Sequence, residues 1–564
     1  MAQDLQDYTG VMSSSKLQES EVRIKHSLNK NEEKFRVDRR KTVQQSLQKL
    51  GICCSVDKVP NIALVGSGGG ERAMVGLLGS LVHFQKTILL DCVLYLSGVS
   101  GSTWCMASLY QEPDWSTKLE SVKDKIIQRL GGPAVSWGDS FAKLKKYYYE
   151  KDIFSLTDFW AAMVVTTFVK EIDEHTLTEY LDQHSKDPLP IYTVIDKQCK
   201  QKKEGDPWFE ITPHEAGFSL TGAFVDASSF GSQFEKGSMI KKQPEIDMLY
   251  LQALCGSALA DGGEILKFLW QKIKDLFESK KNILEEMGKE DPDPSIDKGF
   301  QVILDLVDMN LCVLDGKDPS AHDESIRTTL TDLAGGKGQL IFPLGKLDLT
   351  DKEAAKLYME HYTMDVCNNL SVWFKFWPFD FFYSFCRCIV QWIWGRKYDF
   401  LHNMTAKPVP VALLESETRD YIDAGLLLNS PYFSVLRKER NIDLIISLDF
   451  SDGDPFTTVK DAAKMCKERS IPFPEVNIPS DDFQKPKDFY VFKGKNVPTV
   501  IHIPLFNVLN CGDDIEAWRK KYCTFQGAYS AEMITDLMEV AGKNIANNKA
   551  KVLKEIREIV GLPE

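Results

Sequence analysis

The chain has 564 residues, of which 43% are hydrophobic and 26% are charged, proportions that are typical of a folded globular protein. Its 68 basic and 81 acidic side chains give a net charge of −13, which argues against nucleic acid as the main partner because phosphate binding requires a basic surface. The 13 cysteines include no C-x-x-C pair, so neither a disulfide framework nor a zinc or other metal site is expected. The start MAQDLQDYTG lacks an apolar signal region, and no run of eighteen apolar residues follows, so we expect neither secretion nor a membrane span.

The first segments of the chain are polar and then basic. Residues 1–20 are expected to form a flexible tail. Residues 22–50 contain nine basic and three acidic side chains, a net charge of 9 − 3 = +6, with the sparse apolar spacing of a helix. Two interpretations remain open for this basic helix: a solvated helix packed on the domain, or a contact with an anionic membrane.

The next segments predict an α/β core. The apolar stretches VPNIALVGSGGG and VLYLSGVSG each end in glycine and lead into a helix, which indicates parallel strands with crossover helices. Strands are predicted again at RDYIDAGLLL, NIDLIISLDF and VPTVIHIPLFN, before a long C-terminal helix. Between these parts the sequence is mainly helical. We therefore expect one domain over residues 21–564, with a core at about 21–240 and 415–564 and an inserted helical cap or lid at about 241–414.

The two glycine turns carry the candidate chemistry. Ser100 stands in the frame G-V-S-G-S between a strand and a helix, a position that exposes a serine hydroxyl as a nucleophile. The run GSGGGER at residues 66–72 offers backbone N–H groups at a helix start, which suits an oxyanion hole. A dinucleotide fingerprint would need glycine at Glu71, and a phosphate loop would need Gly-Lys where Glu71 and Arg72 stand. The combination therefore favours acyl transfer.

A serine nucleophile needs a base, and two arrangements are open from the residues alone. Asp423 ends the strand RDYID, and His502 lies on the later strand VIHIP, so a Ser-Asp-His triad in hydrolase order is possible. The apolar alternation around His502 also fits a structural histidine. The other arrangement is a dyad in which Asp423 contacts Ser100 directly. Arg72, one turn after the glycines, has the forked donors that grip a phosphate, which would select phospholipid.

The segment 373–400 is rich in aromatic residues, with 13 of the 60 in the chain. Lys375, Asp380 and Arg387 prevent it from spanning a bilayer. Aromatic residues mixed with cations suit the membrane interface, although a buried aromatic cluster lining the cap is equally consistent with the sequence. The candidate membrane-contact residues are Trp373, Phe374, Trp377, Trp392 and Trp394.

Seven motifs together resemble the group IV cytosolic phospholipases A2, and most closely their gamma type: GSGGGERAM, SGVSGSTW, WFEITPHEAGF, FGSQFEKG, YIDAGLLLNSP, SLDFSDGDPF and PLFNVLN. The resemblance implies a patatin-like α/β core with a central mixed, largely parallel sheet and a helical cap. It implies that Ser100 is the nucleophile and Asp423 the base of a dyad, with Gly68 and Gly69 as oxyanion donors and Arg72 as the phosphate-binding residue. It also implies hydrolysis of the sn-2 acyl ester of glycerophospholipids, with lysophospholipase and transacylase activity on lysophospholipids, and without a cofactor. His502 becomes structural in this interpretation.

The resemblance also bears on regulation. Only 65 residues precede Gly66, too few for a calcium-binding C2 sandwich, so we expect no C2 domain and no calcium requirement. The printed sequence ends GLPE, which does not match a prenylation box, so we expect no prenyl anchor. We expect a cytoplasmic protein that associates peripherally with intracellular membranes. The alternatives are an esterase or thioesterase that uses His502, and a catalytically silent lipid-binding protein.

Overall fold

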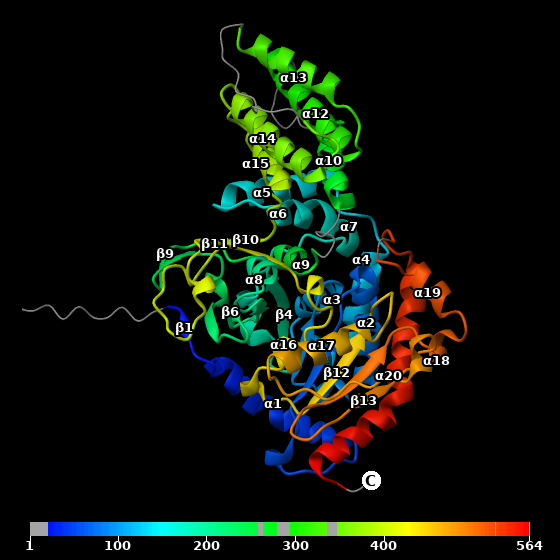
Figure 1. Ribbon diagram of the computed structural model, residues 1–564. Coiled ribbons are helices and arrows are strands. Elements are labelled where there is room, and N and C mark those ends of the chain that lie inside the picture. Colours follow the sequence, from blue (N-terminus) through cyan, green and yellow to red (C-terminus); the bar gives the residue numbers. More distant parts are fainter. Residues whose placement is uncertain (1–20, 258–262, 279–293, 336–346, 525, 563–564) are drawn as a thin grey trace, which may run out of the picture.

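The computed structural model describes residues 21–257, 263–278, 294–335, 347–524 and 526–562 (Figure 1). Residues 1–20, and most of the stretches KEDPDPS and AGGKGQ, lie outside this description. The described chain is built on a 12-stranded mixed sheet in the order β1-β7-β6-β5-β4-β3-β2-β12-β14-β13, with β11 pairing with both β4 and β10. A separate hairpin pairs β8 with β9. The strand bounds are β1 Arg23–Ile24, β2 Ile62–Gly66, β3 Tyr95–Gly98, β4 Leu189–Asp196, β5 Trp208–Ile211, β6 Glu215–Phe218, β7 Ala223–Asp226, β8 Gln233–Glu235, β9 Ser238–Lys241, β10 Arg396–Tyr398, β11 Thr418–Asp423, β12 Leu444–Asp449, β13 Tyr490–Phe492 and β14 Thr499–Pro504.

The centre of this sheet is parallel. Strands β4, β3, β2, β12 and β14 pair in parallel, and the flanking strands pair antiparallel. The sequences IALVG of β2 and LIISLD of β12 are buried at every position, because helices cover both faces of a parallel sheet. The predicted α/β fold class with a mixed, largely parallel sheet is confirmed.

Some helices connect the strands of the sheet, and others form a group apart from it. The bounds are α1 Lys30–Lys49, α2 Gly70–Lys86, α3 Gly101–Tyr110, α4 Leu119–Leu130, α5 Trp137–Glu150, α6 Leu156–Trp160, α7 Thr166–Val169, α8 Lys197–Lys202, α9 Met248–Cys255, α10 Gly263–Glu278, α12 Pro294–Leu314, α13 Ser320–Leu333, α14 Lys352–Leu370, α15 Phe379–Val390, α16 Tyr432–Val435, α17 Thr457–Glu468, α18 Val508–Cys511, α19 Ile515–Lys521 and α20 Ala531–Val560. The helix that follows the turn at Ser100 begins at Gly101. Helix α7 ends at Val169, where Lys170 takes a left-handed conformation.

Helices α2 and α20 pack closely because each presents a glycine to the other. A Cβ on Gly79 would lie 2.7 Å from the Cα of Met538, and a Cβ on Gly542 would collide with the ring of His83. Glycine is the residue that permits such an approach. The C-terminal helix is therefore fixed along the helix that starts at the glycine run.

The helices α10 and α12 to α15 stand together beyond α5, α6 and α7, away from the sheet (Figure 1). Aromatic rings join the two groups: Phe159 of α6 and Phe385 of α15 stack with ring centres 4.3 Å apart. Two elements inside residues 241–414 belong instead to the sheet region, because α9 packs on β11 and β10 pairs with β11.

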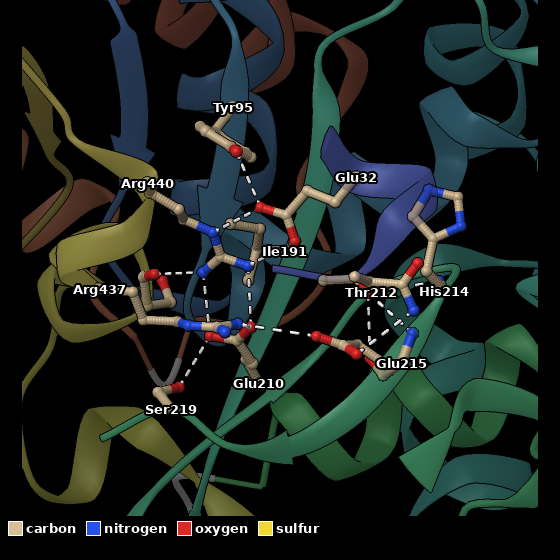
Figure 2. Close-up of polar contacts among 12 residues, drawn as sticks. Glu32, Tyr95, Ile191, Glu210, Thr212, His214, Glu215, Ser219, Arg437 and Arg440 are labelled. Atoms are coloured by element: carbon tan, nitrogen blue, oxygen red, sulfur yellow. Dashed lines mark hydrogen bonds and ion pairs between the residues drawn. The ribbon is translucent and has the colours of Figure 1, made fainter. Parts of the chain in front are cut away.

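The N-terminal basic segment is fastened to the core by buried ion pairs (Figure 2). Its helix, α1, begins only at Lys30, after the short strand β1. Glu32 of α1 accepts hydrogen bonds from Arg440 at 2.9 and 3.2 Å, and Arg440 also donates to Glu210 of β5 at 2.8 and 2.9 Å. The side of α1 that carries Glu32 thus faces the core, while Lys34 and Lys41 remain exposed.

Candidate active site

Ser100 lies on a strained turn between β3 and α3. Its backbone has φ 53° and ψ −124°, a conformation that non-glycine residues rarely adopt and that is concentrated at functional sites. The side chain is 7% exposed. This is the strand-to-helix turn that the G-x-S-x-G pattern predicts.

The second glycine turn packs directly against the first. A Cβ on Gly101 would collide with the carbonyl oxygen of Gly70, and a Cβ on Gly68 would lie 2.8 Å from the Cβ of Ser100. The hydroxyl of Ser102 donates to the carbonyl of Ser67 at 2.6 Å. The glycines are therefore required for the two turns to meet, and the glycine run lies beside Ser100.

Asp423 reaches the same place through the strand register. Strands β3 and β11 lie on the same side of β4, since β5 occupies the other side. Gly98, at the end of β3, pairs with Tyr192, and Asp423, at the end of β11, pairs with Val194. Two residues along a strand span about 7 Å, so the ends of β3 and β11 face each other across this short interval. A Cβ on Gly425 would lie 3.1 Å from Asp423 Oδ1 and 3.6 Å from Val99, the neighbour of Ser100.

The carboxylate of Asp423 is fully buried and held in place by the backbone. The N–H of Gly425 donates to its Oδ1 at 2.8 Å, and the N–H of Asp423 itself donates to the hydroxyl of Ser257 at 3.2 Å. Ser257 was not singled out from the sequence, because nothing in its local pattern marks it.

The N–H groups of the glycine run are the candidate oxyanion donors. In this structure the N–H of Gly68 donates to the carbonyl of Asn429 at 3.1 Å, so this donor must be shared or released to bind an oxyanion. Gly69 is the N-cap of α2, with φ 155°. Asn429 was missed as a contact of the site, although it lies in the motif YIDAGLLLNSP.

Arg72 lies beneath the glycine run and is 1% exposed. Its Nε donates to the carbonyl of Phe450 and its Nη1 to the carbonyl of Tyr522, both at 2.5 Å. Its Nη1 also lies 3.2 Å from Asp452 Oδ2, whose side chain is 40% exposed. The guanidinium therefore joins the glycine run to the segments after β12 and α19.

His502 lies away from Ser100. It pairs with Ser447 on β12, and strands β2 and β12 separate its strand β14 from β3. Three steps at about 4.8 Å each put β14 about 14 Å from β3. Its Nε2 donates to the carbonyl of Pro455 at 2.7 Å, and burial lowers the pKa of the ring despite the nearby charge of Asp449. These contacts are those of a neutral structural histidine.

The aromatic candidates for membrane contact differ in exposure. Trp394 is 1% exposed and Phe374 is 4% exposed. Trp373, Trp377 and Trp392 are half-buried. Only the last three have surface available in this conformation. No described helix is long and apolar enough to cross a membrane, and the described residues contain no group of three or more potential metal ligands.

Glu71 is a titratable group beside the glycine run that the sequence did not identify as functional. Burial raises its pKa from 4.5 to about 7, although the N–H of Tyr529 donates to its carboxylate at 3.0 Å. The folded state therefore binds a proton more tightly than the unfolded chain, and its stability falls as the pH rises from 4.5 to about 7. The full difference corresponds to about 3 kcal/mol.

Replacing Glu71 with glutamine is expected to remove the free-energy cost of ionising this buried carboxylate. Above pH 7 we expect Glu71→Gln to be more stable than the wild type by up to about 3 kcal/mol, and below pH 5 by less than about 1 kcal/mol. Urea denaturation at pH 5 and pH 8 measures the difference. Glu539→Gln, at a side chain that is 66% exposed, is the matched control and should show no such pH dependence. An equal effect of Glu71→Gln at both pH values would contradict the prediction.

Comparison with known proteins identifies the family. The model of the lysophospholipase catalytic domain matches residues 62–261. The chain is 34% identical to cytosolic phospholipase A2 gamma of Mus musculus, over 98% of this chain and 93% of that one. It is 33% identical to cytosolic phospholipase A2 gamma of Homo sapiens, over 96% and 97%. The structure of the human GIVD cytosolic phospholipase A2 superposes with a TM-score of 0.65 at 20% identity, over 96% of this chain and 69% of that one.

The chain belongs to the group IV cytosolic phospholipase A2 family, and its matched domain is the phospholipase A2 and lysophospholipase catalytic domain. The family and the enzyme class predicted from the seven motifs are confirmed.

Proposed function

We propose that this protein is a calcium-independent phospholipase A2 that hydrolyses the sn-2 acyl ester of glycerophospholipids, with Ser100 as nucleophile and Asp423 as its base. The observation that carries the proposal is the register on β4, which brings the end of β3 and the end of β11 together. We also propose lysophospholipase and transacylase activity, since water and a lysophospholipid hydroxyl are equivalent acceptors for an acyl group on a serine.

In the proposed reaction Asp423 accepts the proton of the Ser100 hydroxyl as the serine oxygen attacks the ester carbonyl. The glycine run, with Gly68 and Gly69 as donors, stabilises the oxyanion. The lysophospholipid leaves with the proton from Asp423, and an acyl ester remains on Ser100. Water then attacks this ester, gives its proton to Asp423, and releases the fatty acid as Ser100 recovers its own proton.

The role of Arg72 is to bind the substrate phosphate. The proposal is supported by its place under the glycine run and by its exposed partner Asp452. The other bonds of Arg72 go to the carbonyls of Phe450 and Tyr522 and to the hydroxyl of Thr524. A phosphate would therefore displace Asp452 while the two carbonyls hold the guanidinium in place. Bidentate contacts of this kind discriminate phospholipids from neutral esters.

We further propose that residues 241–414, apart from α9 and β10 in the sheet region, form a cap over a core made of residues 21–240 and 415–564. The protein would act in the cytoplasm at the surface of intracellular membranes. The half-buried aromatics Trp373, Trp377 and Trp392 are the first candidates for membrane contact, with Phe374 and Trp394 available only after a rearrangement. The mixture of aromatic rings with lysine in this segment supports an interfacial position.

Covalent labelling and a calcium-free assay test this function together. We expect the protein to release fatty acid from phospholipid vesicles at the same rate in EGTA and in added calcium. An alkyl fluorophosphonate should add once per chain, on the peptide that contains Ser100, and should abolish release. Heat-denatured protein is the labelling control. A label on another residue, or release that requires calcium, would contradict the corresponding part of the proposal.

A further inference from the structure

A cavity lies among the helices beyond the core, apart from the candidate active site. Its volume is about 660 Å³, within the range of about 300–1,000 Å³ that is usual for small-molecule sites. Helices α10, α12, α14 and α15 and the residue Trp392 contribute the lining, which includes none of Ser100, Asp423, Gly68, Gly69 and Arg72. In Figure 1 these helices stand above α5 and α6, while α2 and α3 lie in the core below.

One side of the cavity is apolar. Leu266 and Trp270 of α10, Val313 of α12, Met359 of α14 and Val390 of α15 line it. Trp270 and Met359 are 1% and 4% exposed, so these side chains are anchored in the helical packing. A surface of this kind binds hydrocarbon in preference to polar groups.

Helix α14 supplies the other side, and it does so with two rows of side chains. Ala355 and Met359 form an apolar row, and Lys352, Lys356 and Glu360 form a charged row at the i, i+4 spacing of one helix face. Glu353 also lines the cavity. Within the described residues, none of these four charged side chains forms an ion pair, whereas Lys267 at the same rim pairs with Asp315 at 2.9 Å. The rim of the cavity thus offers two lysines and two glutamates to a ligand.

We propose that this cavity binds a single-chain lipid with a zwitterionic headgroup, a lysophospholipid, at a site distinct from the one that performs hydrolysis. The acyl chain lies against the apolar row and the side chains of α10, α12 and α15. The phosphate lies near Lys352 and Lys356, and the quaternary amine near Glu353 and Glu360. Charges of both signs along one edge of an apolar cavity match a zwitterion better than a fatty acid, which carries only an anion, or a neutral glyceride, which carries no charge.

The inference rests on the proposed function only for the source of the ligand, since a lysophospholipid is the product that the proposed reaction leaves. The occupied cavity would brace α14 and α15 against α10 and α12. Because α15 packs on α6 through Phe385 and Phe159, the ligand would also stabilise the contact of these helices with the layer beneath them.

The test uses the full chain with Ser100→Ala, which prevents turnover. Lysophosphatidylcholine with a short acyl chain, below its critical micelle concentration, is titrated in a calorimeter. Ala355→Trp fills the cavity from the apolar row of α14, and Leu357→Trp, at a position on the same helix that is 54% exposed and does not line the cavity, is the matched control. We expect Ala355→Trp to weaken one binding event at least tenfold and Leu357→Trp to leave it unchanged.

Two further arms locate the ligand and test the headgroup. A lysophosphatidylcholine with a diazirine at the end of its chain should label peptides from α10 or α14, even if Ala355→Trp fails to fold. A fatty acid and an alkyltrimethylammonium ion of equal chain length should bind more weakly than the zwitterion, and Lys352→Ala combined with Lys356→Ala should remove part of that difference.

Each outcome decides a separate point. Binding that Ala355→Trp does not change, with labels only near Ser100 or Asp423, would overturn the second site and leave the proposed function intact. Labels on α14 with no fatty acid release by the wild type would support the cavity and contradict the proposed function. Equal affinity for all three headgroups would overturn the assignment of a zwitterion.

Discussion

Replacement of Ser100 by alanine, or of Asp423 by asparagine, is expected to lower kcat for phospholipid hydrolysis about 10⁴-fold. Asparagine keeps an oxygen for the N–H of Gly425, which donates to Asp423 Oδ1 at 2.8 Å, so the fold should survive. It lacks the basicity that takes a proton from the serine. Initial rates on vesicles, with the circular dichroism of each variant, measure the loss.

The matched control for this prediction is His502. A glutamine there can still donate to the carbonyl of Pro455, the partner that lies 2.7 Å from His502 Nε2. We expect His502→Gln to keep its rate within about tenfold of the wild type, since the strand spacing puts β14 about 14 Å from β3. The dyad would be excluded if a folded His502→Gln variant hydrolysed phospholipid about 10³-fold or more slowly than the wild type while Asp423→Asn stayed active.

The second large effect is expected at the buried charge cluster of Figure 2, which contains Glu32, Glu210 and Arg440. Replacing Arg440 with methionine is expected to lower the free energy of unfolding by about 3–5 kcal/mol, because buried Glu32 then loses its ion-pair partner and buried Glu210 keeps only Arg437. Burial raises the pKa of Glu210, but the charges of Arg440 and Arg437 outweigh burial and lower it to about 2. Urea denaturation measures the loss of stability, with Lys438→Met, at an exposed neighbour, as the control.

The pH dependence separates this charge effect from a packing defect. In the wild type the depressed pKa of Glu210 gives stability that is present above pH 4.5 and declines as the pH falls toward 2. In Arg440→Met, Glu32 has lost its ion-pair partner and Glu210 keeps only Arg437, so both carboxylates take up protons at higher pH. The variant should therefore regain part of its stability between pH 7 and pH 5, and the triple variant with Glu32→Gln and Glu210→Gln should regain most of it at pH 7. A loss that is independent of pH would contradict the charge explanation.

The sequence predicted the local features of the site and not the contacts between distant segments. The strand-glycine-helix pattern located both turns, because a turn is specified by its own few residues. The approach of the end of β11 to the end of β3 depends on two strands that pair with different parts of β4, which no local pattern encodes. The seven-motif resemblance named Asp423 as a candidate but could not supply this register.

Contacts between distant segments also explain why the sequence alone did not show the partners of the charged residues. The fork of Arg72 suggested a phosphate ligand, and the structure adds bonds to the carbonyls of Phe450 and Tyr522, which are far away in the sequence. The basic segment 22–50 suggested a solvated or membrane-bound helix. Its buried Glu32 and Arg39 could be recognised only once their partners were placed, because ion pairs across the chain leave no periodic signal in either segment.

At Ser100 the backbone conformation lowers the stability of the fold, while the proposed catalysis requires the serine hydroxyl. A serine at φ 53° and ψ −124° carries a conformational cost of about 1–3 kcal/mol, and glycine would adopt the same geometry with little strain but has no hydroxyl. If Ser100 is the nucleophile as proposed, the most stable version of this turn is inactive. A library screened only for survival at high temperature would enrich glycine at residue 100, whereas a screen that also requires lipid hydrolysis would retain the serine.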